Sequence, residues 1–194
     1  MTRSGTTVRL FVNGVLDTTT GTASGAINTL SYAPIIGAIN ASGTYASFMN
    51  GNISNLRIIN GTALYTSTFT PPTAPLTAIA NTVLLTCQSA TLVDNSVTNY
   101  TINPVTATLK PVAFSPFTVT NTTLTTYNPT QFSGSVYFNG TTDYLSIPYN
   151  PTLNLSNNNF TIEGWFYFLS VASGQQPVSG YTSASTNKIG RAHV

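Results

Sequence analysis

Short alternations of apolar and polar residues that run into Asn-Gly dipeptides constrain this chain more than any other feature. The first alternation covers residues 7–12, meets Asn13-Gly14 and resumes at Val15-Leu16. Asn-Gly between two such runs favours a type I′ hairpin turn. The same dipeptide recurs at Asn50-Gly51, Asn60-Gly61 and Asn139-Gly140. The pattern predicts a succession of short antiparallel strands and tight turns.

Composition supports an all-β fold. Only 5% of the residues are charged, against about 25% in ordinary domains, and 35 Thr and 20 Asn stand in their place. Threonine is β-branched and prefers strands, whereas asparagine prefers turns. Because no segment keeps a 3.6-residue apolar period, we expect an antiparallel β-sandwich with almost no helix.

The strand expected over residues 160–169 is apolar on both faces. Phe160, Ile162 and Phe166 alternate with Trp165 and Tyr167. A strand of this kind is predicted to be central and covered on both sides, which places Trp165 in the core. Two segments interrupt the strands: a Pro-rich stretch at 68–81, expected to be a linker or an edge crossing, and a polar loop at 121–129.

Charge and hydropathy exclude several classes of function. A net charge of +2 from ten charged side chains gives no basic surface for nucleic acid. No apolar run reaches the 18 residues of a membrane span. The single cysteine, Cys87, has no histidine near it in the sequence and is expected to be a small buried side chain. The last residues, 189–194, match a reading frame of a sequencing-adapter oligonucleotide, so we interpret them, with the lone His193, as an artefact.

Residues 10–14 and 51–58 form a first group of motifs, and residues 93–96, 135–145 and 160–165 form a second. Both groups resemble parts of laminin-G-like and concanavalin A-like jelly-roll modules of the bacteriophage and environmental type. Leu10-Phe11-Val12-Asn13-Gly14 resembles their late "YVNG" strand and turn, and residues 51–58 resemble the closing "G-x-I-x-x-L-R-I" strand. Their opening half is matched further along the chain. Residues 93–96 resemble its "D-x-S" turn, 135–145 its "S-x-x-F-N-G-x-x-D-Y-L" segment and 160–165 its "F-T-I-E-x-W" strand.

The order of these motifs suggests the domain organisation. Closing motifs precede opening motifs, so residues 1–67 resemble the C-terminal half of one module and 82–188 the N-terminal half of the next, joined by 68–81. Met1 would then be an internal or truncated start. We expect the strands of 7–59 and 134–169 to share one sandwich, as in a circular permutant, since each half alone leaves open sheet edges. The predicted core joins Phe138, Leu145, Ile162 and Trp165 to Leu10, Val12, Leu56 and Ile58.

The sequence offers little for catalysis. The resemblance includes glucanases, whose active strand has an E-x-D-x-x-E pattern, and glycoside hydrolysis generally needs two carboxyl groups. Glu163 is the only glutamate, and Asp17, Asp94 and Asp143 are the only aspartates. We therefore expect no enzymatic activity and a structural role for Glu163.

Metal and glycan sites are the remaining candidates. Many modules of the resembled family hold one Ca²⁺ at the rim, and Asp143, Asn139 and Asp94 are the residues that could ligate it. The alternative, which the sequence favours, is that they cap turns. Tyrosines in or near turns are the candidate sugar-binding side chains: Tyr32, Tyr45, Tyr65, Tyr127 and Tyr149.

The sequence thus predicts a non-catalytic binding and structural module. The resemblance implies an extended surface or virion protein, such as a phage tail fibre or adhesin, with a glycan or a host surface as ligand and neighbouring modules of the same chain as partners. It implies an extracellular or virion-surface location. The alternative is an accessory carbohydrate-binding domain of a secreted glycoside hydrolase.

Overall fold

The computed structural model describes residues 1–26, 34–41, 43–106, 109–117, 134–170 and 174–180 of the chain. The described part is all-β, as predicted, and its one helical element is a single 3-10 turn, η1 (Pro151–Leu153). The strands, in chain order, are β1 (Thr2–Ser4), β2 (Thr7–Arg9), β3 (Phe11–Val12), β4 (Val15–Leu16), β5 (Gly21–Thr22), β6 (Ile35–Ile36), β7 (Ile39–Ala41), β8 (Thr44–Ala46), β9 (Asn50–Asn60), β10 (Thr82–Thr86), β11 (Asn103–Pro104), β12 (Lys110–Val112), β13 (Ser135–Asn139), β14 (Leu145–Ser146), β15 (Phe160–Phe168) and β16 (Val178–Ser179).

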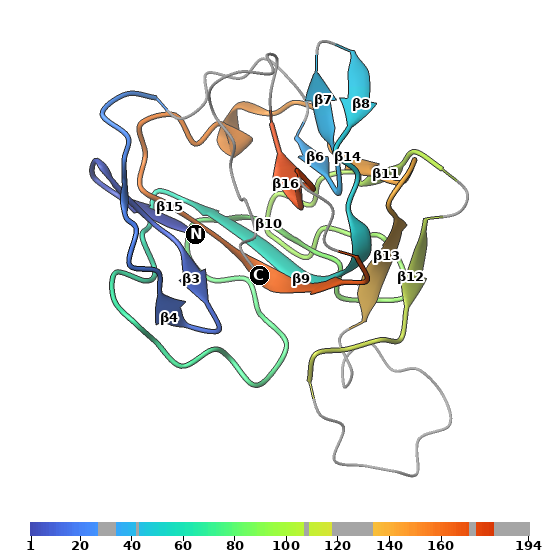
Figure 1. Ribbon diagram of the computed structural model, residues 1–194, viewed down its shortest axis with the longest axis horizontal. Helices are drawn as coiled ribbons and strands as arrows, with labels where there is room; N and C mark the ends of the chain where they lie inside the picture. The colour runs from blue at the N-terminus through green and yellow to red at the C-terminus, as the bar shows by residue number, and fades with distance from the viewer. Residues whose placement is uncertain (27–33, 42, 107–108, 118–133, 171–173, 181–194) are drawn as a thin grey trace.

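The larger sheet is organised around β9. It has the order β12-β13-β9-β15-β1-β2-β5, and all its pairings are antiparallel. One edge of β9 pairs with β15, and the other edge pairs with β13 and then with β10. Figure 1 shows β9 and β15 side by side across the middle of the molecule. Strands from residues 7–59 thus pair directly with strands from 134–169, as expected for two stretches that share one sandwich.

The second layer is a four-stranded sheet with the order β11-β14-β6-β16. It contributes Ile36, Leu145 and Val178 to a core cluster whose other members come from the larger sheet and from the loops. Leu56, Ile58, Phe138, Leu145 and Ile162 all belong to this cluster, which confirms that part of the predicted core. Removal of apolar surface from water contributes about 25 cal/mol per Å², so this shared core is the main source of stability.

The β3–β4 hairpin forms as predicted at Asn13-Gly14. Both residues have positive φ, 51° and 78°, which a type I′ turn requires. Asn50-Gly51, in contrast, is not a turn but the start of β9. Gly51 has a φ of 147°, and a Cβ on it would lie 1.9 Å from the carbonyl oxygen of Tyr167. Glycine is needed there because β15 approaches the backbone closely.

The prediction that Leu10, Val12 and Trp165 belong to the core was wrong. Val12 is 47% exposed, and Leu10 and Trp165 are only partly buried. The chain leaves the sheet after β2, which ends at Arg9, so Leu10 and Val12 pack outside the two layers. Trp165 lies opposite Ser54, on the face of the larger sheet that does not meet the core. Other elements cover both faces of β15 only in its first half, since Tyr167 near its end and Leu169 just after it are more than half exposed.

The Pro-rich segment crosses the outer face of the larger sheet. The N–H of Leu76 donates to Asn55 Oδ1 at 2.9 Å, and Arg57 Nη1 donates to the carbonyl of Thr77 at 2.7 Å. Leu76 is buried. In the described residues no helix is long and apolar enough to cross a membrane. The polar loop predicted at 121–129 and the segment 189–194 lie outside the described residues.

Candidate functional site

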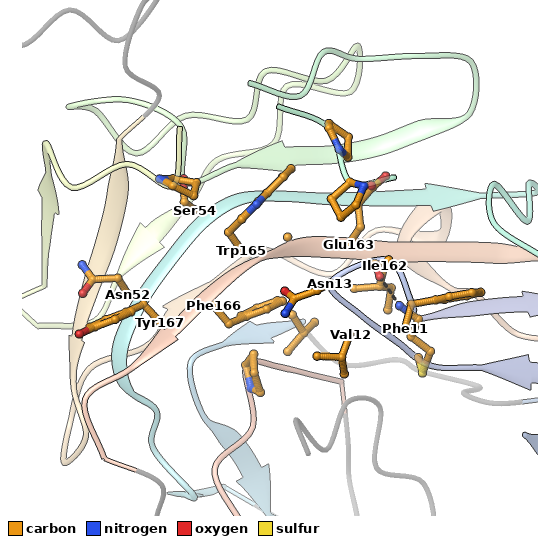
Figure 2. Close-up of a pocket in the computed structure, with 18 of the residues that line it drawn as sticks. Phe11, Val12, Asn13, Asn52, Ser54, Ile162, Glu163, Trp165, Phe166 and Tyr167 are labelled. Carbon is orange, nitrogen blue, oxygen red and sulfur yellow. Dashed lines mark hydrogen bonds between the residues drawn. The ribbon is translucent and has the colours of Figure 1, made fainter. Parts of the chain in front are cut away.

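A groove of about 620 Å³ follows the second half of β15. Its walls come from the β3–β4 hairpin, the Pro-rich segment and the chain after β12, and from both faces of β15 (Figure 2). The described residues that line it are mostly apolar and aromatic: Met1, Leu10, Phe11, Val12, Asn13, Gly14, Asn52, Ser54, Tyr65, Phe69, Pro71, Pro72, Phe114, Pro116, Ser135, Ile162, Glu163, Gly164, Trp165, Phe166, Tyr167, Phe168, Pro177 and Val178.

Aromatic and polar side chains face each other across β9 and β15 on the outer face. Trp165 is in register with Ser54, and Tyr167 with Asn52. Directly opposed residues of an antiparallel pair share a face, so the two rings lie beside an amide and a hydroxyl group. The amide nitrogen of Asn52 donates to Ser135 Oγ at 3.2 Å, and Ser54 Oγ donates to the carbonyl of Gly134 at 2.7 Å.

The segment after β12 supports these two aromatic rings. Phe117 is buried and meets Trp165 edge-on, with ring centroids 4.9 Å apart. Phe114 meets Tyr167 in the same way at 5.3 Å, but Phe114 is 51% exposed and Tyr167 is 53% exposed. Edge-to-face contacts hold aromatic rings in fixed orientations. Trp165 is thus fixed from one side, while Tyr167 and Phe114 present open ring surface to solvent.

An ion pair closes one end of the groove. Arg57 Nη2 and Nε donate to Glu163 Oε1 at 2.6 and 2.8 Å, and the hydroxyl of Tyr65 donates to Glu163 Oε2 at 2.9 Å. Burial, and then the nearby Glu163 carboxylate, raise the pKa of Tyr65 to about 12. Both carboxylate oxygens of Glu163 therefore have donors, which agrees with the structural role expected from the sequence.

Of the three suggested tyrosines that the structure describes, Tyr45, Tyr65 and Tyr149, only Tyr65 lines the groove. Its ring stacks on Phe69, and its hydroxyl is held by Glu163. Tyr45 stacks on Tyr144 with centroids 4.0 Å apart, beside a separate small cluster, and Tyr149 is exposed in the connection that follows β14. Tyr32 and Tyr127 lie outside the described residues.

Asp94, a candidate calcium ligand, is buried and organises its own loop. Its Oδ1 accepts from the N–H groups of Leu85 and Ser96, both at 2.9 Å. Its Oδ2 accepts from the N–H of Tyr100 at 2.9 Å and from the hydroxyls of Ser96 and Thr98. These contacts are those of a turn-capping aspartate.

The other two candidate ligands, Asn139 and Asp143, share the turn that follows β13. Asn139 Oδ1 accepts from three successive N–H groups, those of Thr141, Thr142 and Asp143, at 2.9 to 3.1 Å. Asp143 is buried and accepts from the hydroxyl of Thr106 and, at 3.3 Å, from the N–H of Asn139. Across the described ranges no group of three or more His, Cys, Asp or Glu side chains could hold a metal ion.

Sequence reasoning missed Trp165, Tyr167, Phe114 and Asn52 as site residues. The signal was present, because Trp165 and Tyr167 are two residues apart and must share a face of a strand. Apolar residues on both faces of a strand favour burial on both sides. The same pattern is equally compatible with a strand whose second half borders an exposed groove.

Comparison of the chain with protein families, with curated proteins and with solved structures gave no match. The class that the fold defines is an all-β protein of the antiparallel sandwich type with an aromatic groove on its larger sheet.

Proposed function

We propose that this chain is a non-catalytic carbohydrate-binding sandwich, part of an extended surface or virion protein that contacts glycans on a host surface. The observation that supports it best is the pairing of exposed Tyr167 with Asn52 across β9 and β15, next to Phe114. A sugar ring has an apolar C–H face that packs on an aromatic ring and a hydroxyl rim that needs hydrogen-bonding partners. Tyr167 and Phe114 supply the first, and Asn52 the second.

The charge of the groove favours an uncharged glycan. Glu163 is the charged side chain among the described lining residues, and its two oxygens are held by Arg57 and Tyr65. A sialic acid or sulfated sugar would find no cationic side chain among those residues. Binding pockets for small molecules are commonly apolar with a few polar groups that fix orientation, and this groove has that composition.

The same observations support a binding role without catalysis. Hydrolysis of a glycosidic bond generally needs an acid and a second carboxylate across the bond. Of the four carboxylic side chains in the sequence, only Glu163 lines the groove. Glu163 accepts hydrogen bonds from Arg57 and from the hydroxyl of Tyr65, so its carboxylate holds Tyr65 in position.

A glycan array probed with the labelled protein tests the proposal. We expect signals on neutral oligosaccharides that fall about two- to tenfold in Tyr167→Ala, since an aromatic contact contributes about 0.5–1.5 kcal/mol. Tyr149→Ala is the matched control, because Tyr149 is also an exposed tyrosine but does not line the groove. Equal losses in the two variants, or no glycan signal for the unaltered protein, would contradict the proposal.

A further inference from the structure

Four Asn-Gly dipeptides occur in the chain, at residues 13–14, 50–51, 60–61 and 139–140. An asparagine that precedes a glycine is chemically labile, because the backbone nitrogen of the glycine can attack the side-chain amide carbon of the asparagine. Glycine favours this attack, since it has no Cβ to shield the nitrogen or to restrict the backbone. The four dipeptides are identical in sequence, so a difference in their reactivity has to come from the structure.

The dipeptide at Asn60 is held on both of its reacting groups. Asn60 Nδ2 donates to the carbonyl of Thr152 at 2.8 Å, and Asn60 Oδ1 accepts from the amide of Asn158 at 2.9 Å. The N–H of Gly61 donates to the carbonyl of Asn159 at 2.7 Å. Both the amide that would be attacked and the nitrogen that would attack it are therefore engaged.

The dipeptides at Asn139 and Asn50 are also restrained. Asn139 Oδ1 accepts from three successive N–H groups, and its Nδ2 donates to Thr142 Oγ1 at 2.8 Å. Asn50 Nδ2 donates to Ser170 Oγ at 3.0 Å. Gly51 lies within the larger sheet, paired with β13 on one side and with β15 on the other. Reaction at either asparagine requires these bonds to open first.

The dipeptide at Asn13 has none of these restraints. Asn13 is exposed at the tip of the β3–β4 hairpin, and its side chain makes no hydrogen bond to any described residue. The carbonyl of Gly14 accepts from the N–H of Phe69 at 2.9 Å, but the N–H of Gly14 has no acceptor in that part of the chain. Within the described ranges β3 and β4 pair only with each other. A hairpin of two short strands is marginally stable, so its tip rearranges at little cost in free energy.

We propose that Asn13 is a site of spontaneous deamidation, with water as the co-reactant. The nitrogen of Gly14 forms a bond to Asn13 Cγ, the bond from Cγ to Nδ2 breaks, and the proton of the Gly14 N–H leaves with the amide nitrogen as ammonia. Water then opens the cyclic imide. Hydrolysis of the bond to Cγ gives an ordinary aspartyl residue, and hydrolysis of the bond to the backbone carbonyl carbon gives an isoaspartyl linkage.

Both products change a wall of the groove, because Asn13 lines it together with Phe166 and Tyr167 (Figure 2). A carboxylate replaces a neutral amide, and the isoaspartyl linkage also lengthens the backbone of the hairpin tip by a methylene group. The tight turn does not accommodate a longer backbone without a shift of the hairpin. We therefore expect weaker binding of a neutral glycan after deamidation. This consequence rests on the proposed function, whereas the deamidation itself does not.

The rates at the four dipeptides, in the folded chain and in the urea-unfolded chain at pH 8, test the proposal. Deamidation raises the mass of a tryptic peptide, and fragment ions assign the change to Asn13 or to Asn50 within the peptide 10–57. We expect similar rates at all four sites in the unfolded chain. In the folded chain Asn13 should react at least about tenfold faster than the other three, because their hydrogen bonds have to open.

Two results would overturn the assignment: equal rates at the four sites of the folded chain, or a rate at Asn13 as low as those at Asn60 and Asn139. Asn13→Gln is the chemical control, since glutamine has to close a larger ring and reacts slowly. Its peptide 10–57 should keep its mass at position 13 while the other dipeptides react as before.

A glycan titration before and after incubation measures the consequence. The midpoint should rise on incubation of the unaltered chain and stay constant on incubation of Asn13→Gln. An equal rise in both proteins would show that position 13 does not affect the groove. Absence of glycan binding in the fresh protein would refute the proposed function, while the mass spectra would still decide whether Asn13 is the deamidation site.

Discussion

Arg57 and Glu163 lie directly opposite each other on the outer faces of β9 and β15, with Arg57 Nη2 2.6 Å from Glu163 Oε1. Their side chains are 5% and 12% exposed. The pair joins the central ladder of the sheet to two crossing segments, because Arg57 also donates to the carbonyl of Thr77 and Glu163 accepts from Tyr65. It therefore links the sheet to the wall of the groove.

Removal of one partner of this pair should lower the free energy of unfolding more than removal of both partners. Glu163→Leu leaves the Arg57 guanidinium buried without its counter-charge and is expected to lower the free energy of unfolding by about 3–5 kcal/mol. The double variant Arg57→Leu/Glu163→Leu should recover much of that loss, since no isolated charge remains. Urea unfolding of the three proteins measures the difference. A double variant no more stable than Glu163→Leu would contradict the role assigned to the pair.

The raised pKa of Tyr65 predicts that the folded protein loses stability at high pH. Its pKa is raised from 10 to about 12, so between these values the unfolded chain releases the phenolic proton while the folded chain retains it. The unfolded state then binds fewer protons, and stability falls as the pH rises through this window. Tyr65→Phe removes this contribution and should give a shallower decline from pH 10 to 12. Denaturant unfolding at each pH measures the free energy of unfolding of both proteins. If the two curves against pH run parallel, Tyr65 does not contribute to the decline.

Cys87 should be unreactive in the folded protein. Burial raises the pKa of its thiol to about 12, and the thiolate is the nucleophilic form. A thiol reagent such as Ellman's reagent at pH 8 is expected to modify the native chain only at the rate of its opening and to modify the urea-unfolded chain at once. Fast modification of native protein would show that Cys87 is accessible.

Asp94 should be needed for stability and not for calcium. Asp94→Ala leaves the N–H groups of Leu85, Ser96 and Tyr100 without their acceptor, and each unsatisfied buried group costs about 1–3 kcal/mol. Asp17→Ala is the control, because the carboxylate of Asp17 caps only the exposed N–H of Thr19. Thermal unfolding with excess Ca²⁺ and with chelator should give the same midpoint. A higher midpoint with Ca²⁺, lost in Asp94→Ala, would restore the metal site.

The sequence predicted the sheet better than it predicted the site. Alternation and the Asn-Gly turn located the β3–β4 hairpin, and apolar pairs such as Leu56 and Ile58 identified core positions. The exposure of Trp165 and Tyr167 could not be predicted, since it depends on their contacts with Phe117 and Phe114, which come from a different part of the chain. The turn signal at Asn50-Gly51 was overridden because β15 pairs with that glycine, a contact more than 100 residues distant in the sequence.

Trp165, the only tryptophan of the chain, lies in the groove and reports on it directly. The measurement that tests glycan binding most directly is a titration of its fluorescence with the best neutral oligosaccharide from the array. We predict a saturable change in emission, with the midpoint shifted about two- to tenfold to higher concentration in Tyr167→Ala and unchanged in Tyr149→Ala. An emission spectrum that stays constant while the glycan demonstrably binds would place the site elsewhere and contradict the account.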